Sequence, residues 1–386
     1  MGSAVPDTLS AFERHRLVDE WANGVELSGH PGISTLIERG RRVPAIRTAV
    51  RCGANILTYA ELFDRIGRPA TAERCERSMD GAVRLLADIA EAANSGVVLT
   101  LSVPTGSHSA APRSPASTIA LHPDALAAAV DDRRAVATDC RTQHVDRAMG
   151  SSDVRLLATD WACADTAVEL LAALADGATL VVATEAQRQD PAALAELIAT
   201  CAATHVVADA NTLSRFTDTF APTLASVRRW DVTGTRCPAI LPGLLREIAP
   251  GSVAGFAYTA PEYAGVAARG PLDGSGRVRP IPGARVLVLD EALQPVPAGG
   301  YGQLFLGGAA LAAEVPDTAA DFVADPFTAG GRLCRTGIFG QWTADGWLTF
   351  TAVDSITNSV ATLENTVSIT DVGTVGETSA VTEIAA

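Results

Sequence analysis

The sequence contains no lysine, so all 30 of its basic residues are arginine. A GC-rich genome explains this preference, since alanine, glycine, arginine and valine are all abundant. Codon usage does not, however, remove a lysine that chemistry requires. Reactions that depend on a lysine side chain, such as those of proteins with a Walker phosphate loop, are therefore excluded for these residues.

Other signatures are missing as well. The seven cysteines are scattered and include no CxxC pair, which argues against a zinc site or a disulfide framework. There is no GxSxG or HExxH motif, and no apolar run reaches the roughly 20 residues of a membrane-spanning helix. A net charge of −14 without a basic stripe argues against nucleic-acid partners. We expect no metal site, no membrane partner and a cytoplasmic location.

Residues 46–257 alternate short apolar runs with amphipathic segments, a pattern typical of a layered α/β domain with a largely parallel sheet. Apolar spacing predicts helices over residues 82–93, 168–175, 191–200 and 240–248. Apolar, β-branched runs predict strands over residues 96–103, 179–183, 204–207 and 253–258. Residues 102–117 and 217–223, rich in Pro, Ser and Thr, are predicted as loops.

The pattern changes at residue 258 to short strands between Gly and Pro, which predicts a small β-rich subdomain over residues 258–352. Residues 1–45 are expected to be linker-like. Residues 353–386 contain no aromatic residue and no arginine, so we expect a poorly ordered or loosely packed tail.

A series of short segments adds a more specific signal. In chain order they are LSAFERHRLVDEW (9–21), LTYAEL (57–62), CERSMD (75–80), GATLVVA (177–183), RPIPGARVLVLD (279–290), GQLFLGG (302–308), FVADPF (322–327) and RLCRTG (332–337). Together they resemble the core motifs of nonribosomal-peptide-synthetase adenylation domains, in the adenylate-forming (AMP-binding) superfamily. The first is similar to the linker that precedes such a domain.

The resemblance implies the layered α/β fold and β-rich subdomain of that family. It also implies an ancestor that activated a carboxylate with ATP and Mg²⁺ and loaded it onto a carrier thiol. In the family, a mobile C-terminal lid carries a catalytic lysine. Because residues 353–386 contain no lysine, we expect the lid to be missing or vestigial.

The family's glycine-rich phosphate loop is not recognisable. Residues 119–126, IALHPDAL, resemble the segment that follows this loop, which places SAAPRSPAST (109–118) at the loop itself. That segment has no glycine, two prolines that lack an N–H donor, and Ser117 where the family has lysine. Residues 105–107, TGS, are an alternative remnant but lack the second glycine and the lysine.

Only a few further site residues are retained. YTAPE (258–262) resembles the family's YGPTE, which implies that Tyr258 packs near adenine and that Glu262 helps to hold Mg²⁺. The alternative is a strand-end tyrosine and a solvated glutamate. Ile338 stands where the family aspartate binds the ribose hydroxyls, and an aliphatic side chain accepts no hydrogen bond. Asp165 is the candidate for binding a substrate amino group, with a helix N-cap as the alternative.

We therefore expect a catalytically degenerate adenylation-like domain, with no catalytic residue and no bound cofactor. Its role would be structural or interactive in nonribosomal-peptide biosynthesis, with a synthetase module or an accessory protein as partner. One alternative is an active carboxylate-activating enzyme that uses ATP and Mg²⁺ through rearranged phosphate contacts. Another is a decaying gene product without a role.

The linker-like segment offers a candidate contact surface. If it is helical, Phe12, Leu17, Val18 and Trp21 form one apolar stripe. The stripe then either binds a partner or packs on the chain's own core.

Overall fold

The computed structural model describes residues 9–24, 31–67, 78–96, 99–103, 117–143, 153–159, 163–260, 263, 265–308, 310–312 and 322–351, with the side chains at 100–103, 117–121, 135–143, 163–165 and 351 excepted. The chain divides into two compact units, residues 1–350 and 351–386. Apart from the backbone of Thr351, the second unit lies outside the described residues, and so do the predictions made for the tail and the lid.

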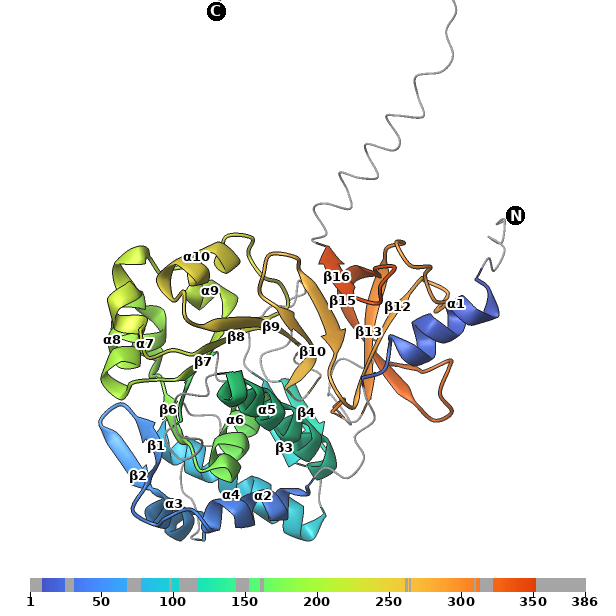
Figure 1. Ribbon diagram of the computed structural model, residues 1–386. Coiled ribbons are helices and arrows are strands. Elements are labelled where there is room, and N and C mark those ends of the chain that lie inside the picture. Colours follow the sequence, from blue (N-terminus) through green and yellow to red (C-terminus); the bar gives the residue numbers. More distant parts are fainter. Residues whose placement is uncertain are drawn as a thin grey trace, which may run out of the picture. The chain divides into compact units, whose positions relative to one another are not determined.

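One large sheet runs through the described part of the first unit (Figure 1). Its parallel part has the strand order β9-β8-β7-β5-β6-β1. These strands are β1 (Thr48–Cys52), β5 (Val154–Ala158), β6 (Thr179–Val182), β7 (His205–Asp209), β8 (Arg229–Gly234) and β9 (Val253–Thr259). The short strand β2 (Asn55–Thr58) pairs with β1 at the end of the sheet. The predicted parallel α/β architecture is confirmed.

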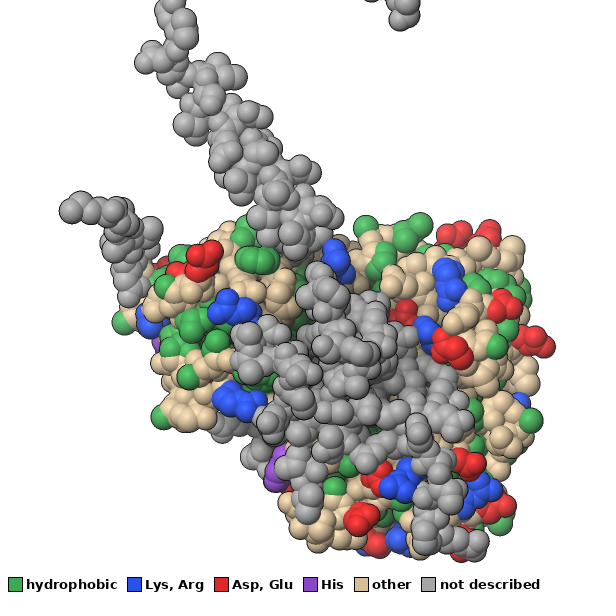
Figure 2. Space-filling model, turned by 180° about the vertical axis from the view of Figure 1, so that it is seen from behind, with side chains coloured by type: hydrophobic (Ala, Val, Ile, Leu, Met, Phe, Trp, Pro, Cys, Tyr) green, Lys and Arg blue, Asp and Glu red, His purple; other side chains and the backbone are tan. Residues whose placement is uncertain are grey.

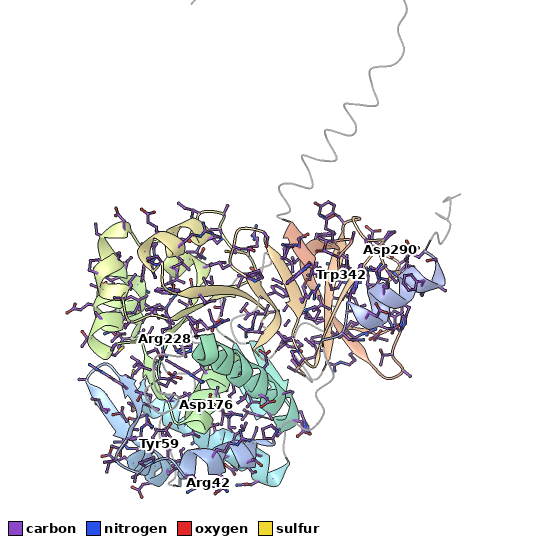
Figure 3. The ribbon with its side chains drawn as sticks, in the orientation of Figure 1. Arg42, Tyr59, Asp176, Arg228, Asp290 and Trp342 are labelled. Atoms are coloured by element: carbon purple, nitrogen blue, oxygen red, sulfur yellow. The ribbon has the colours of Figure 1, made fainter. Side chains whose placement is uncertain are left out.

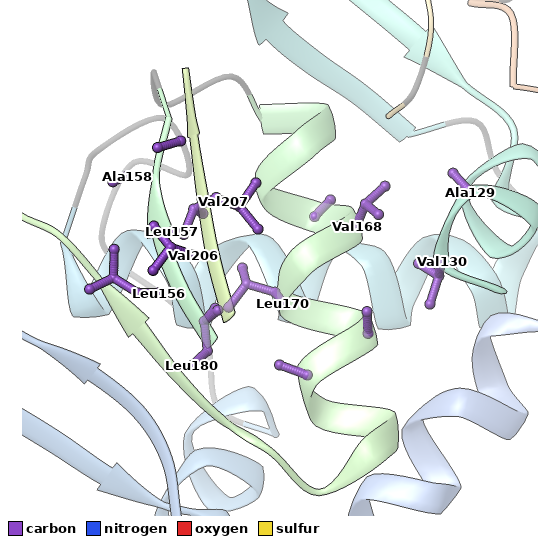
Figure 4. Packing of buried hydrophobic residues seen from close by; sticks show 14 of the residues in the cluster. Ala129, Val130, Leu156, Leu157, Ala158, Val168, Leu170, Leu180, Val206 and Val207 are labelled. Atoms are coloured by element: carbon purple, nitrogen blue, oxygen red, sulfur yellow. The ribbon is translucent and has the colours of Figure 1, made fainter. Parts of the chain in front are cut away.

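Helices cover both faces of the parallel strands (Figure 1). The helices are α2 (Ile33–Arg41), α3 (Tyr59–Ile66), α4 (Met79–Ser95), α5 (Pro123–Gln143), α6 (Cys163–Asp176), α7 (Glu185–Gln189), α8 (Pro191–Cys201), α9 (Ala210–Leu213) and α10 (Leu241–Ile248). All side chains from Thr166 to Ala175 in α6 are buried, so this helix is enclosed by the sheet and by its neighbours. Figure 4 shows Leu170 of α6 on the side of β5, β6 and β7, and Val168 on the side of α5.

The remaining strands form the predicted β-rich region. They are β10 (Val266–Pro271), β11 (Arg277–Pro280), β12 (Ala284–Leu289), β13 (Gly302–Gly308), β14 (Phe322–Ala324), β15 (Arg332–Trp342) and β16 (Leu348–Thr351). These strands pair with their neighbours in antiparallel orientation, as in β12 with β13 and β13 with β15. Strand β9 crosses the predicted border between residues 257 and 258, and the domain borders stay predictions.

The N-terminal segment packs on this β-rich region. It forms α1 (Ala11–His15) and a π-helical turn, η1 (Arg16–Glu20), in which Leu17 and Val18 are each only 4% exposed. The ring of Trp21 lies 5.9 Å from that of Trp342, which Figure 3 labels. Only Phe12, 66% exposed, points away from the core. Leu17, Val18 and Trp21 therefore pack on the chain's own core, which is the second of the two alternatives for this stripe.

Local sequence explains several element boundaries. Ser10 with Glu13, Thr58 with Glu61, and Thr184 with Gln187 form capping boxes at the starts of α1, α3 and α7. Residues 217–223 were predicted as a loop, but most of them belong to a 3-10 helix, η2 (Asp218–Leu224). A 3-10 helix of this kind is a short connector, and η2 includes Pro222. Within the described residues, no helix is both long and apolar enough to cross a membrane.

Candidate functional site

The order of the parallel strands creates a place where a ligand could bind. The chain leaves β5 through α6 to reach β6 on one side, and it later reaches β7 on the other side of β5. At such a reversal of strand order, the two connections leave β5 and its neighbour in opposite directions and a crevice opens at the carboxyl ends of the strands. Open α/β sheets bind their ligands in this crevice. The candidate site therefore lies at the carboxyl ends of β5, β7, β8 and β9.

Asp165 follows β5 at this edge. It is the third residue of α6 and so lies inside the first turn of the helix, while its side chain lies outside the described atoms. One turn further along α6, the side chain of Val168 lies against Gly265, where a Cβ would come within 3.4 Å of it. The chain that follows Glu262 therefore runs past the N-terminal half of α6.

Tyr258 lies near the end of β9, where its backbone pairs with Gly234 of β8 and with Ala268 of β10. Its side chain is fully buried. The ring of Phe350, from β16, lies 4.8 Å from the ring of Tyr258 at an interplanar angle of 40°. The Tyr258 ring, packed against Phe350, therefore presents no open face to solvent. Glu262 lies outside the described residues.

Ile338 lies in β15 and is half-buried against the apolar core. Its backbone N–H donates to Thr336 Oγ1 at 3.1 Å, and Thr336 Oγ1 donates to the carbonyl of Leu304 at 2.8 Å. The hydroxyl of Thr336 is thus used within the strand pair. The side chain of Ile338 adds no polar group to the site.

The predicted phosphate-loop segment connects two paired strands. Strands β3 (Leu99–Val103) and β4 (Ser117–Leu121) form a separate antiparallel pair, in which Val103 opposes Ser117. Residues 104–116, with the TGS alternative and most of the predicted loop, lie outside the described residues. Ser117, the position of the family lysine, begins β4.

Asp209, which sequence reasoning missed, ends β7 at the same edge. Its Oδ1 accepts from the backbone N–H of Thr212 at 2.8 Å, its Oδ2 accepts from Thr212 Oγ1 at 2.7 Å, and Arg188 lies 3.5 Å away. Asp209 therefore caps α9. An Asp directly before a helical run was the available signal.

The loop after β8 offers no reactive nucleophile. Burial raises the pKa of the Cys237 thiol to about 11, so the thiol stays protonated at neutral pH. Among the described residues, no group of three or more His, Cys, Asp or Glu side chains could hold a metal ion. With the ring of Tyr258 covered and an aliphatic side chain at residue 338, the described residues do not fit ATP in the manner of the family.

Residues 128–314 match the model of the AMP-binding enzyme family. The chain is 35% identical over 245 residues to the probable non-canonical nonribosomal peptide synthetase CymA of Salinispora arenicola, a match that covers 61% of this chain and 3% of CymA. It is 38% identical over 192 residues to novobiocin biosynthesis protein H of Streptomyces niveus, covering 47% of this chain and 31% of that protein. The chain thus spans less than a third of either curated relative.

Solved structures share the fold. The nonribosomal peptide synthetase FmoA3 (S1046A) aligns with a TM-score of 0.66 and 21% identity, over 91% of this chain and 45% of FmoA3. The N-terminal subdomain of Klebsiella oxytoca NpsA aligns with a TM-score of 0.61 and 16% identity, over 84% of this chain and all of that subdomain (100%). At these identities the likeness establishes the fold alone.

Proposed function

Since the chain carries an AMP-binding domain related to the adenylation domains of nonribosomal peptide synthetases, we propose that it is a catalytically degenerate member that serves natural-product biosynthesis through contact. Its partner is a synthetase module or an accessory protein of the same cytoplasmic pathway. On the face in Figure 2, the described acidic and basic side chains are intermixed, in keeping with a protein rather than a nucleic acid as partner.

The observation that carries this proposal is the packing of Tyr258. Its ring is fully buried and packs against Phe350, so a nucleotide base reaches it only if the surrounding residues move. Stacking on an aromatic ring needs an open face. In this packing Tyr258 is a core residue, and its contact with Phe350 joins β9 to β16.

Two sequence features point in the same direction. The phosphate-loop position has no glycine, and Ile338 replaces the ribose-binding aspartate. No lysine is present to neutralise charge on the phosphates. Each lost transition-state contact costs on the order of 3 kcal/mol, or roughly a hundredfold in rate, so three losses leave negligible catalysis.

Amino-acid-dependent exchange between ATP and pyrophosphate tests the catalytic part. We expect no exchange above a no-enzyme control with any proteinogenic amino acid, in an assay where an active adenylation domain serves as positive control. Exchange clearly above background would overturn the proposal in favour of an active enzyme with rearranged phosphate contacts.

Binding of Mg²⁺-ATP, followed by calorimetry, tests the role of the covered ring. We expect no binding by the native chain. Phe350→Ala exposes the Tyr258 face, while Phe12→Ala, remote and exposed, is the matched control. Tight binding by the native chain, unaffected by either change, would contradict the proposed covering of the site.

A further inference from the structure

Six charged side chains meet in the interior between α5, α6 and the sheet. The residues are Asp132, Arg133, Glu169, Arg229, Asp231 and Arg269, and none of their side chains is more than 14% exposed. Three are guanidinium groups and three are carboxylates, so the cluster is electrically balanced.

Asp231 is the centre of the cluster. Its Oδ2 accepts from Arg133 Nη1 at 2.5 Å, while its Oδ1 accepts from Arg229 Nε at 2.9 Å and from Arg269 Nη1 at 3.3 Å. Arg133 Nε also donates to Glu169, and Arg269 Nη2 donates to Asp132 at 3.2 Å. Burial alone would raise the pKa of Asp231, but the three guanidinium groups hold it well below its usual range.

The cluster ties together elements that are far apart in the sequence. Asp132 and Arg133 come from α5, Glu169 from α6, Asp231 from β8 and Arg269 from β10. These elements flank the candidate site: α5 follows β4 closely, α6 carries Asp165, and β8 ends at Gly234. Losing one partner of a buried ion pair leaves an uncompensated charge, which is strongly destabilising.

We propose that this cluster is a clamp that makes α5, α6, β8 and β10, together with β9 between the two strands, open as one local unit, separately from the β12–β13 hairpin. Apolar packing alone would let either helix separate from the sheet on its own. With the clamp, separating α5 from Asp231 also breaks the contacts of α6 and β10. The inference is independent of the proposed function, because the clamp acts whether or not the chain adenylates a substrate.

Native-state hydrogen exchange followed by mass spectrometry tests the clamp. In the native chain we expect amides of α5, α6, β8 and β10 to share one free energy of opening. Asp231→Asn should make all four exchange faster, the most affected by roughly a hundredfold or more, and by factors that differ between elements because the coupling is lost. Amides of β12 and β13 should change less than about threefold. Leu287→Ala, in the separate small core around β12, is the matched control and should give the opposite distribution.

Glu169→Gln keeps the contact between Arg133 and Asp231, so it provides a milder variant should Asp231→Asn fail to fold. It should accelerate the same four elements by a smaller common factor. Acceleration confined to the substituted element, or spread equally over β12 and β13, would overturn the proposal. Exposed Asp345→Asn should leave all of these segments unchanged.

Discussion

His205 illustrates how a single residue in the parallel sheet acquires its chemistry from its neighbours. In register it lies between Arg155 of β5 and Arg229 of β8, and residues in register on parallel strands share one face of the sheet. The side chain is fully buried, and His205 Nδ1 lies 2.9 Å from Thr204 Oγ1. Burial, Arg155 and Arg133 lower the pKa of His205 to about 3, which outweighs the opposite effect of Asp153 and Asp231.

This depressed pKa predicts a pH dependence of stability. In the unfolded chain His205 takes up a proton near pH 6.5, whereas in the folded protein it does so only near pH 3. Between these values the unfolded state binds more protons, so the free energy of unfolding falls on acidification, by at most about 1.4 kcal/mol per pH unit. We expect His205→Gln to flatten this slope in urea titrations between pH 4.5 and 6.5.

The pH window and a matched variant isolate the residue. Above pH 4.5 Asp231 is ionised in the folded state, because its pKa is lowered, and largely ionised in the unfolded chain. The exposed His15, replaced in the same way, should leave the slope unchanged. Parallel slopes for the native chain and His205→Gln would contradict the prediction.

At the same scale, sequence predicts the position of a site residue better than its surroundings. The strand predicted over residues 253–258 correctly placed Tyr258 near the end of a strand, β9. That Phe350 packs against its ring could not be predicted, because the contact depends on how β16 pairs with distant strands. The charge cluster around Asp231 was missed for the same reason: its members share no sequence spacing.

At the scale of elements, helices and strands with strong apolar periodicity were predicted well. The predicted helix over residues 191–200 is α8, which Asp190 caps and Pro191 begins, and the predicted strand over 179–183 is β6. The segment assigned as a linker was less well predicted, because α2 within it packs on α4 and α6. Its apolar residues Ile33, Leu36 and Ile37 have helical spacing, but this pattern is shorter than the window of 11–18 residues on which such a prediction rests.

The N-terminal segment is expected to stabilise the β-rich region. Trp21 packs against Trp342 and over Gly346, and Asn23 extends the sheet by bridging Arg285 of β12. Trp21→Ala removes a large part of this contact, so we expect a loss of about 2 kcal/mol or more in the free energy of unfolding.

Urea titration followed by circular dichroism measures this loss. Phe12→Ala is the matched control, because Phe12 is 66% exposed, and it should change stability by less than about 0.5 kcal/mol. Equal stability of Trp21→Ala and the native chain would mean that the segment is only loosely attached.

At the scale of the whole molecule, the sheet is continuous but its two regions differ in how they are held. Residues 46–257 enclose α6 within one large apolar core. The β-rich region contributes one face to that core and keeps a small core of its own with Ala22, Leu287, Leu289, Phe305 and Leu333. The two regions meet where β10 pairs with β9 through five residue pairs, whereas within the β-rich region β11 pairs with β16 through only two, Arg277 with Thr349 and Val278 with Leu348.

This construction predicts that the β-rich region opens before the α/β region in urea. The short β11–β16 pairing couples β12, β13, β15 and β16 only weakly to the rest of the sheet, and their smaller core buries less apolar surface to oppose the entropy of opening. Two buried cysteines report on the regions separately: Cys52, 7% exposed in β1, and Cys334, fully buried in β15. After pulse labelling of thiols at increasing urea, we expect Cys334 to react at a lower urea concentration than Cys52.

Leu306→Ala, in β13, should shift the midpoint of Cys334 more than that of Cys52, whereas Leu171→Ala, in α6, should do the reverse. Coincident midpoints for both thiols in all three chains would show that the sheet transmits stability along its whole width and that residues 1–350 unfold as one unit.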